Sequence, residues 1–234
     1  MNNEEVNLTN DAYSLHRILK TDIKKDPNVE EDEIIFGCGC FWGAEKCFWK
    51  LPGVVTTSVG YAGGEKNNPT YYEVCSGLTG HSEVVRVIWD KREIDVSDLL
   101  KMFWECHDPT QKNRQGNDMG TQYRSAIYYK NENNIKTILA SKEQYQTELS
   151  KKNLGLIETE IKMIDSYFYA EQYHQQYLAS AGSRQYCSAS PTKVKLGVFT
   201  GSNYKLEDHI WENFNWEVDK CVLRSDNNPI KNNI

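Results

Sequence analysis

The order of strand and helix patterns between residues 33 and 130 is the feature that most limits what this chain can fold into. Runs with the residue types and alternation of strands occur at 33–36, 54–60, 83–89 and 125–129. A helical pattern follows the first run at 42–51, and a second opens at Ser97, after the third run, and is ended by Pro109. The order βαββαβ is that of the ferredoxin-like, or split βαβ, arrangement, so we expect one α+β domain built as an α/β sandwich.

The rest of the domain continues this alternation. Apolar residues in 135–149 form one face of a long helix, 159–164 has the pattern of a strand, and 170–179 that of a further helix. Two connections, 61–82 and 108–123, are long for a compact domain. Because loops of that length are usually functional, we expect side chains that bind or react in both of them.

Segments of different composition flank this domain. Residues 1–32 are polar, end in an acidic run and lack sustained periodicity, so we expect a mostly unstructured arm. The main domain is predicted at 33–190 and a C-terminal extension at 191–234. Apolar side chains of the extension fall near helical spacing, which predicts a partly helical segment able to dock: Ile210, Trp211, Phe214, Val218 and Val222.

Composition and charge argue against several classes of function. Hydrophobic residues make up 39% of the 234, enough for a sizeable core. The formal net charge of -6 argues against a protein whose main role is to bind nucleic-acid phosphates. No run approaches about 18 uncharged apolar residues, so we expect no membrane span. The polar N-terminus lacks a signal or transit pattern, so a soluble cytoplasmic protein is the default expectation, and nothing requires more than a monomer.

The chain contains an odd number of cysteines, seven in all: Cys38, Cys40, Cys47, Cys75, Cys106, Cys187 and Cys221. Without a secretory signal a set of structural disulfides is not expected, because thiols inside cells are kept reduced. Most of the seven should therefore be thiols that pack as small apolar side chains.

Cys40 is the first candidate for chemistry. It lies where the first strand ends and a helix begins, and Gly37 and Gly39 allow a tight turn there. Unpaired N–H groups and the positive end of the helix dipole favour the thiolate, which is the nucleophilic form. Cys38 shares much of this environment, so the two cysteines could also bind a metal. No histidine lies at the usual zinc spacing, however, so a structural zinc site has little support.

Residues 39–45 read GCFWGAE, and further blocks follow in the order and spacing of one known family. These blocks are 60–64 (GYAGG), 68–71 (NPTY), 73–77 (EVCSG), 79–83 (TGHSE), 107–110 (HDPT), 114–118 (RQGND), 120–125 (GTQYRS) and 173–178 (YHQQYL). On these motifs, which span roughly residues 33–187, the chain is identified as a member of the class A peptide-methionine (S)-sulfoxide reductases.

The resemblance implies a set of catalytic roles. A sulfoxide needs a soft nucleophile at sulfur and a proton donor at oxygen, and Cys40 matches the family's nucleophile. Glu83 matches the general acid, which an apolar pocket would keep protonated near neutral pH. Tyr71 and Tyr123 match two phenols that hydrogen-bond the sulfoxide oxygen. Asp118 matches a carboxylate that supports the tyrosines and the substrate backbone.

Aromatic and histidine side chains of the same blocks receive other roles. Phe41 and Trp42 match the wall that receives the terminal methyl group of the substrate, where sulfur contacts aromatic faces favourably. We expect His81, His107 and His174 to make structural hydrogen bonds, and none of them is assigned the role of a base.

The resemblance also implies a way to recycle the nucleophile. Once methionine leaves, Cys40 is a sulfenic acid, which condenses with a second thiol. Cys187 aligns with the family's resolving cysteine, which implies a Cys40–Cys187 disulfide that thioredoxin, or dithiothreitol in vitro, reduces. The segment 180–190 must then move to bring the two sulfurs together. After Cys187 the Gly-rich stretch and second recycling cysteine of many members are missing. Either the relay has a single step, which we favour, or Cys221 is a displaced second recycling thiol.

The leading hypothesis is therefore an enzyme that repairs methionine-S-sulfoxide, free or in oxidised proteins, without a metal, flavin or nicotinamide. Two other classes stay open. One is a thiol-based redox sensor with negligible turnover, and the other is a zinc-stabilised binding domain that uses Cys38 and Cys40. The remaining thiols, Cys47, Cys75 and Cys106, are expected to be packed or bystander cysteines, and Cys38 is the one most prone to side reactions.

Overall fold

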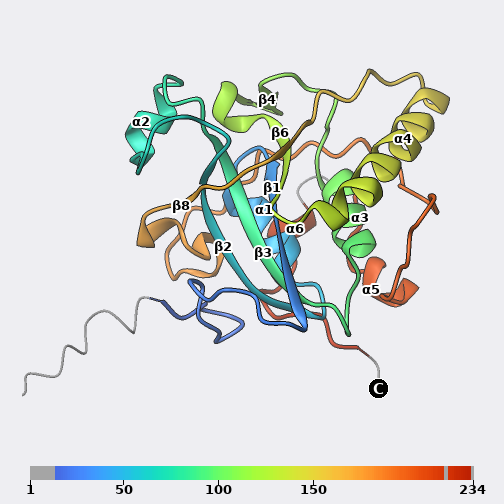
Figure 1. Cartoon of the computed structure of the whole chain (residues 1–234), viewed down its shortest axis with the longest axis horizontal. Coiled ribbons are helices and arrows are strands. Elements are labelled where there is room, and N and C mark those ends of the chain that lie inside the picture. Colours follow the sequence, from blue (N-terminus) through green and yellow to red (C-terminus); the bar gives the residue numbers. More distant parts are fainter. Residues whose placement is uncertain (1–13, 219–220, 233–234) are drawn as a thin grey trace, which may run out of the picture.

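A six-stranded mixed sheet forms the centre of the molecule in the computed structural model, which describes residues 14–218 and 221–232 (Figure 1). Its strands, in spatial order, are β7 (Glu160–Met163), β6 (Ser125–Tyr129), β1 (Glu31–Cys38), β3 (Ser82–Asp90), β2 (Val54–Ala62) and β8 (Tyr167–Tyr169). Neighbouring strands are antiparallel except β6 and β7, which are parallel. Two short strands, β4 (Arg114–Gln115) and β5 (Asp118–Met119), pair separately within one of the long connections.

Helices cover the sheet and contact one another. They are α1 (Phe41–Trp49), α2 (Tyr71–Cys75), α3 (Val96–Cys106), α4 (Ile135–Lys151), α5 (Asp208–Trp211) and α6 (Cys221–Arg224). Helix α1 packs on β2 and β3, and α3 packs on both α1 and α4. The four predicted strands and two helices between residues 33 and 130 are all present in the predicted order, so the α+β expectation is confirmed.

Local sequence explains where the two central helices begin and end. Helix α3 starts with a capping box in which Asp95 accepts the Ser97 N–H while the Asp98 carboxylate accepts the Asp95 N–H. After α1, Gly53 takes a φ of +82°, a conformation that side chains resist, and the chain turns into β2. Phe36 of the sheet stacks on Phe48 of α1 at 4.8 Å, which places the main core between sheet and helices.

The predicted helix over 170–179 is wrong. Two 3-10 turns, Gln172–His174 and Tyr177–Ala179, stand in its place, separated by Gln176 in the left-handed conformation. Both the backbone N–H and the side-chain amide of Gln176 donate to the buried Glu45 carboxylate, at 2.8 and 2.7 Å. Tertiary hydrogen bonds thus override the helical pattern of the sequence.

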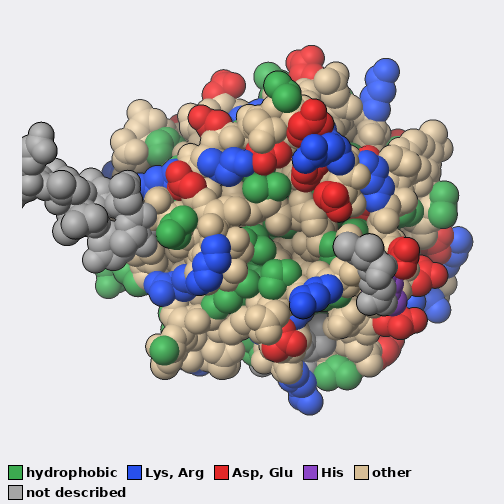
Figure 2. Space-filling model, turned by 90° about the horizontal axis from the view of Figure 1, so that it is seen from below, with side chains coloured by type: hydrophobic (Ala, Val, Ile, Leu, Met, Phe, Trp, Pro, Cys, Tyr) green, Lys and Arg blue, Asp and Glu red, His purple; other side chains and the backbone are tan. Residues whose placement is uncertain are grey.

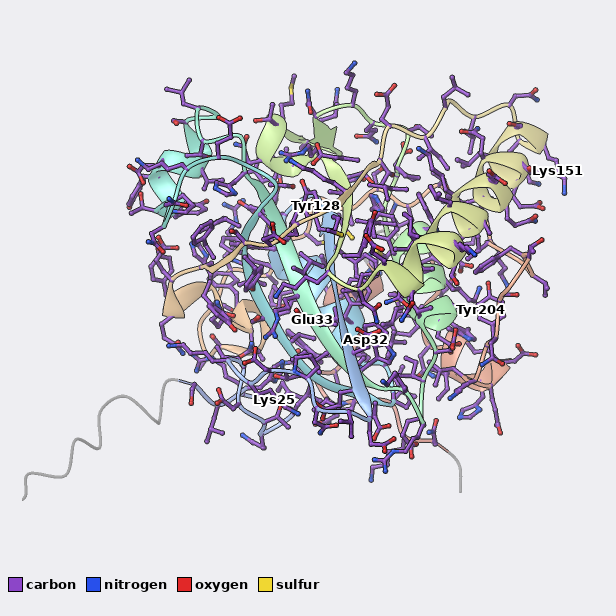
Figure 3. All side chains as sticks on the ribbon, viewed as in Figure 1. Lys25, Asp32, Glu33, Tyr128, Lys151 and Tyr204 are labelled. Atoms are coloured by element: carbon purple, nitrogen blue, oxygen red, sulfur yellow. The ribbon has the colours of Figure 1, made fainter. Side chains whose placement is uncertain are left out.

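The described part of the N-terminal segment packs against the domain. Residues 14–30 form only one bridge, between Leu15 and Asp22, and no helix or longer strand. His16 is nevertheless buried and hydrogen-bonded to the Thr57 hydroxyl at 2.9 Å. Arg86 of β3 donates to the Lys25 carbonyl at 3.0 Å, beside the Glu33 carboxylate on β1 (Figure 3). These contacts tie the segment to the sheet.

The C-terminal extension also lies against the domain. Ile210, Phe214 and Val222 are buried in the main core cluster, although α5 and α6 are two short helices rather than one. The ammonium groups of Lys46 in α1 and of Lys50, directly after it, donate to backbone carbonyls of residues 225–228. Acidic and basic side chains are interspersed over the face seen in Figure 2, without a continuous basic patch. The helices within 14–218 and 221–232 include none that could span a bilayer.

Candidate active site

One pocket of about 280 Å³ collects all seven side chains assigned to catalysis and substrate contact from the sequence. They are Cys40, Phe41, Trp42, Tyr71, Glu83, Asp118 and Tyr123, and Arg184 and Tyr186 complete the lining. The lining comes from the β1–α1 junction, from β3, from the two long connections and from the irregular segment after residue 179, so residues far apart in sequence meet in it.

Cys40 caps the N-terminus of α1, directly after the end of β1. Gly39 makes the turn with a φ of +84°, and a Cβ there would lie 2.5 Å from the Gln115 side chain. The Cys40 side chain is only 8% exposed, and its backbone N–H donates to the Ser188 hydroxyl at 3.3 Å. The turn therefore holds a nearly buried thiol at the edge of the pocket.

The expectation that the helix N-terminus would favour the Cys40 thiolate is not met. Burial raises the pKa of the Cys40 thiol well above its usual value, and the nearby Glu83 carboxyl adds to the rise. A hydrogen bond with the Trp42 backbone lowers the pKa of Cys40, but by less than burial raises it. Since desolvation outweighs the helix end, the Cys40 side chain is a neutral thiol.

Glu83 at the start of β3 has the electrostatics of a proton donor. Its side chain is 2% exposed, and its Oε2 accepts the Phe41 N–H at 3.1 Å. Burial raises the pKa of this carboxyl to about 8, with a smaller contribution from Asp118 and opposition from the Phe41 hydrogen bond. At pH 7 about nine in ten molecules therefore carry the proton.

The two phenols reach the pocket from separate connections. Tyr71 is the first residue of α2, and Thr70 before it caps the helix with a capping box. The Tyr71 backbone N–H donates to the Glu171 carboxylate at 2.8 Å. Tyr123 ends the 3-10 turn Thr121–Tyr123. Burial raises the pKa of both phenols above the usual value, so both remain hydroxyl donors at any physiological pH.

Trp42 is fixed by an aromatic cluster. Its indole N–H donates to His174 Nδ1 at 3.1 Å, and its ring stacks on Tyr177 at 3.8 Å. Burial lowers the pKa of His174 to about 4, so this histidine is neutral. His107 is likewise bonded to the Phe103 carbonyl and the Ser125 hydroxyl, and His81 to the Lys66 carbonyl. Each makes the structural hydrogen bonds expected of it.

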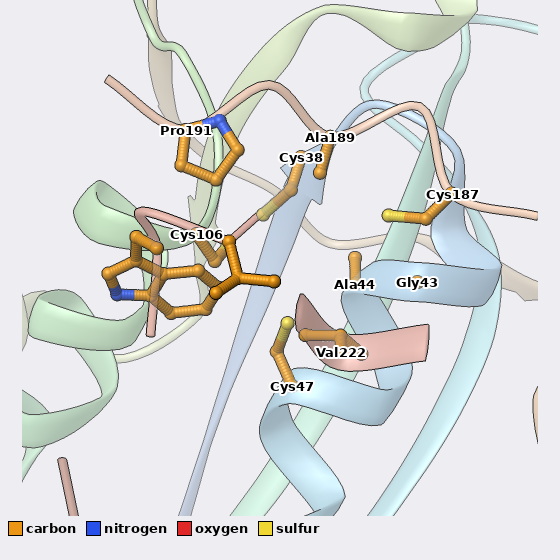
Figure 4. Close-up of a pocket in the computed structure, with 11 residues that line it drawn as sticks. Cys38, Gly43, Ala44, Cys47, Cys106, Cys187, Ala189, Pro191 and Val222 are labelled. Atoms are coloured by element: carbon orange, nitrogen blue, oxygen red, sulfur yellow. The ribbon is translucent and has the colours of Figure 1, made fainter. Parts of the chain in front are cut away.

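Cys187 lies against α1 near Cys40. A Cβ added at Gly43 would come within 2.4 Å of the Cys187 sulfur. The loop that carries Cys187 therefore packs on α1 at a position where the helix has no side chain (Figure 4). Cys187 is buried and close enough to Cys40 to influence its pKa. Cys40 itself is a free thiol. The Cys221 side chain lies outside the described part of the structure.

Comparison with known proteins decides the family. A family model described as peptide methionine sulfoxide reductase matches residues 32–204. The chain belongs to the peptide methionine sulfoxide reductase family. A peptide methionine sulfoxide reductase MsrA from Vibrio vulnificus is 53% identical over 180 residues, 77% of this chain and 86% of the relative. Another from Azotobacter vinelandii is 57% identical over 164 residues, 70% of this chain and 76% of the relative.

Solved structures of this reductase family have the same architecture. Methionine sulfoxide reductase A of Corynebacterium diphtheriae is 44% identical with a TM-score of 0.63, covering 70% of this chain and 79% of its own. Reduced Mxr1 of Saccharomyces cerevisiae is 34% identical with a TM-score of 0.64, covering 70% and 92%. The α+β fold and the assignment as a peptide-methionine sulfoxide reductase enzyme of the MsrA class are therefore established.

The structure adds residues of this reductase that were not assigned from sequence. The Tyr186 hydroxyl donates to Asp118 Oδ1 at 2.5 Å, and the Arg184 guanidinium lies over the Tyr186 ring at 5.2 Å. In the sequence, the one sign that Arg184 and Tyr186 belong to the site is that they lie close to Cys187, which aligns with the family's resolving cysteine. Glu45, within the GCFWGAE block, accepts hydrogen bonds from Gln176 and Thr57, and burial raises its pKa to about 7. It holds α1 in place and does not line the pocket.

Proposed function

We propose that this enzyme reduces methionine-S-sulfoxide, in oxidised proteins and as the free amino acid, with Cys40 as the nucleophile. The observation that carries the proposal is the pairing, in one pocket, of a soft thiol with a carboxyl group that is protonated at neutral pH. Sulfoxide reduction needs both, because sulfur accepts the nucleophile while oxygen must be protonated before its bond to sulfur breaks.

In the first step the Cys40 sulfur attacks the sulfoxide sulfur while Glu83 gives its proton to the sulfoxide oxygen. The oxygen passes to Cys40 as a sulfenic acid, the substrate leaves as methionine, and the thiol proton of Cys40 restores Glu83. The substrate sulfur gains two electrons and Cys40 loses two. Tyr71 and Tyr123 donate hydrogen bonds to the oxygen as charge develops on it, a role supported by their position in the pocket lining.

Phe41 and Trp42 are proposed to form the wall that receives the methyl group. The rigid stacking of Trp42 on Tyr177 supports this, because a fixed wall can distinguish two sulfoxide epimers by shape. Asp118, held by Tyr186, is proposed to bind the substrate backbone.

Recycling is proposed to run through Cys187. Its thiol condenses with the Cys40 sulfenic acid, which forms a disulfide and releases water, and thioredoxin then reduces the disulfide. Cys187 packs against Gly43, which lies about one helical turn after Cys40, and this position supports the pairing of Cys187 with Cys40. We favour this single step over a second one through Cys221. A dominant Cys187–Cys221 bridge in the mass spectrum of the oxidised enzyme after turnover would overturn that preference.

Several broader assignments belong to the same proposal. The core is proposed to be ferredoxin-like, which is supported by the order β6-β1-β3-β2 of its four strands. We propose a catalytic domain at 33–190, with the arm and the extension as additions, and a cytoplasmic monomer that needs only an external thiol reductant.

The test pairs S- and R-sulfoxides of N-acetylmethionine with the wild type, Cys40→Ser and Cys187→Ser, using dithiothreitol or thioredoxin. We expect the wild type to consume the S epimer only, Cys40→Ser to be inactive, and Cys187→Ser to release methionine once and then stall with thioredoxin. Activity confined to the R epimer, or undiminished activity of Cys40→Ser, would refute the proposal. Ready oxidation of Cys40 without turnover would instead favour a redox sensor.

A further inference from the structure

Four large aromatic or apolar side chains stand exposed close to the mouth of the active-site pocket. Two of them, Tyr72 and Met119, directly follow Tyr71 and Asp118, which line the pocket. A group of such side chains, unlike a single exposed one, is typical of an interaction site. The exposed fractions of the four lie between 55% and 90%, and they are Tyr72, Leu78, Met119 and Tyr173.

Ring contacts connect the two tyrosines of this group. The centroid of the Tyr72 ring lies 5.9 Å from that of Tyr71, which in turn lies 4.5 Å from that of His174. The Tyr173 ring lies 4.2 Å from the same histidine. Tyr72 and Tyr173 therefore flank the Tyr71–His174 pair at the edge of the pocket.

Leu78 and Met119 come together where the two long connections touch. Gly77 takes a φ of +74° after α2, the usual left-handed end of a helix, and Leu78 follows it with its side chain 90% exposed. A Cβ added at Gly77 would lie 3.9 Å from the hydroxyl oxygen of Thr121, which is two residues after Met119. We call the four side chains of both halves the apolar rim.

We propose that the apolar rim binds the residues that flank a methionine sulfoxide in an oxidised protein, and that it favours unfolded segments with apolar neighbours. The inference rests on the proposed function, in which the pocket holds the sulfoxide side chain. When that side chain enters the pocket, the chain on either side of it must cross the surface around the mouth. On the side of α2 and β5 this surface is the apolar rim.

The chemistry of the damage explains why an apolar surface fits such a substrate. Methionine is a common core residue, and its oxidation converts an apolar side chain into a polar one, which disrupts the core. The sulfoxide is then presented in a loosened segment whose neighbours are apolar. Since the hydrophobic effect is non-directional, the rim can bind many such segments without a fixed sequence.

The charged groups near the rim have partners within the chain. The Glu73 carboxylate on α2 pairs with the Lys66 ammonium group at 2.9 Å and accepts the Thr70 N–H at 2.9 Å. In the segment after residue 179, the Arg184 guanidinium lies over the Tyr186 ring at 5.2 Å. Burial of apolar surface, rather than a charge on the substrate, is therefore the source of selectivity.

The test compares two pentapeptides with a central methionine-S-sulfoxide, flanked by leucines in one and by serines in the other, with N-acetylmethionine-S-sulfoxide as a third substrate. Dithiothreitol is the reductant, so thioredoxin docking does not enter. We expect the wild type to prefer the leucine-flanked peptide about tenfold in kcat/KM, mainly through KM, the factor for burying about two methylene groups. A double variant, Leu78→Ser with Met119→Ser, should reduce this preference to about threefold or less.

The matched control is Val198→Ser, which should retain the full preference. Val198 is 79% exposed, and Gly197 before it lies near the Gln144 side chain of α4, away from the pocket lining. Equal kcat/KM for the two peptides in the wild type, or a preference that the double variant retains, would overturn the inference.

Other occupants of the rim would give different results. Slower recycling by thioredoxin in the double variant, with its peptide preference intact, would assign the rim to thioredoxin. A wild-type dimer that the double variant loses in analytical ultracentrifugation, again with the preference intact, would assign it to a second copy of the chain. Either result would overturn the inference. A wild type that reduces none of the three sulfoxides would refute the proposed function and the inference with it, whereas reduction without a peptide preference would refute the inference alone.

Discussion

The sharpest prediction concerns Glu83, because its protonation and its proposed role as the acid are coupled. Burial raises the pKa of this carboxyl to about 8, and the Cys40 thiol has a pKa well above its usual value. The resting pair at pH 7 is therefore a carboxylic acid beside a thiol. If the acid drives the reaction, kcat/KM should be flat below about pH 7, where more than about nine in ten carboxyls carry the proton.

Above that range the rate should follow the loss of the Glu83 proton. With a pKa of about 8, half of the free enzyme is active at pH 8 and about one tenth at pH 9. Glu83→Gln keeps the shape of the side chain but has no acidic proton, so its rate should fall by about 10²–10⁴-fold and lose this pH dependence. Glu83→Asp, which keeps the acid on a shorter arm, should recover part of the loss.

The assay follows a single turnover of pre-reduced enzyme with N-acetylmethionine-S-sulfoxide, because the external reductant has a pH dependence of its own. Folding at each pH is monitored by circular dichroism. A rate that climbs between pH 7 and pH 9 would refute the reasoning, because it would make formation of the Cys40 thiolate, and not proton donation, the limiting event. A full rate in Glu83→Gln would refute it as well.

Other predictions address recycling, substrate binding and stability. In Gly43→Ala the added methyl would lie 2.4 Å from the Cys187 sulfur, so the loop must shift. We expect slower thioredoxin-dependent turnover with an unchanged first release of methionine, and equal losses in both phases would contradict this. Tyr186→Phe removes the hydroxyl that bonds Asp118 and should raise KM for a peptide substrate about three- to tenfold with little change in kcat, the range expected for the loss of one ordinary hydrogen bond. Glu45 has a pKa raised to about 7, so the folded chain binds its proton more tightly than the unfolded one and loses stability as pH rises from about 4.5 to about 7. Urea unfolding at pH 5 and pH 8 should therefore show a larger decline in the wild type than in Glu45→Gln, and equal declines would show that Glu45 does not carry the effect.

Periodic patterns and collinear motifs predicted much of this molecule. The strands around Phe36 and Val85 and the helix after Cys40 follow from alternation and from glycine and proline signals, which act locally. The motif blocks identified every side chain that lines the pocket except Arg184 and Tyr186. Those two lie in irregular chain near Cys187, where no periodicity exists to reveal which side chains turn inward.

What the sequence could not supply depends on three-dimensional surroundings. The helix predicted over 170–179 is broken because Gln176 bonds to Glu45, which is 131 positions away in the chain. The raised pKa of Cys40 depends on burial, which a motif does not report. A small cavity beside α1 brings together four cysteines that are dispersed along the sequence, each with the pattern of an ordinary packed cysteine: Cys38, Cys47, Cys106 and Cys187 (Figure 4).

The environment of Cys40 and Glu83 reconciles two demands that conflict. A polar, well-hydrated site would lower the pKa of the thiol but would also ionise the carboxyl, and the sulfoxide oxygen would have no proton donor. Burial in the pocket instead raises the pKa of both groups, which keeps the carboxyl protonated and the thiol neutral. The sulfoxide oxygen leaves badly unless it is protonated, so the acid must keep its proton. The thiol sulfur is a soft nucleophile, and a nearby base can remove its proton as it attacks. Burial therefore favours the proposed reaction. In the proposed mechanism Glu83 becomes that base once it has donated its proton, so one carboxyl would serve both steps and the pocket would need no lowered thiol pKa.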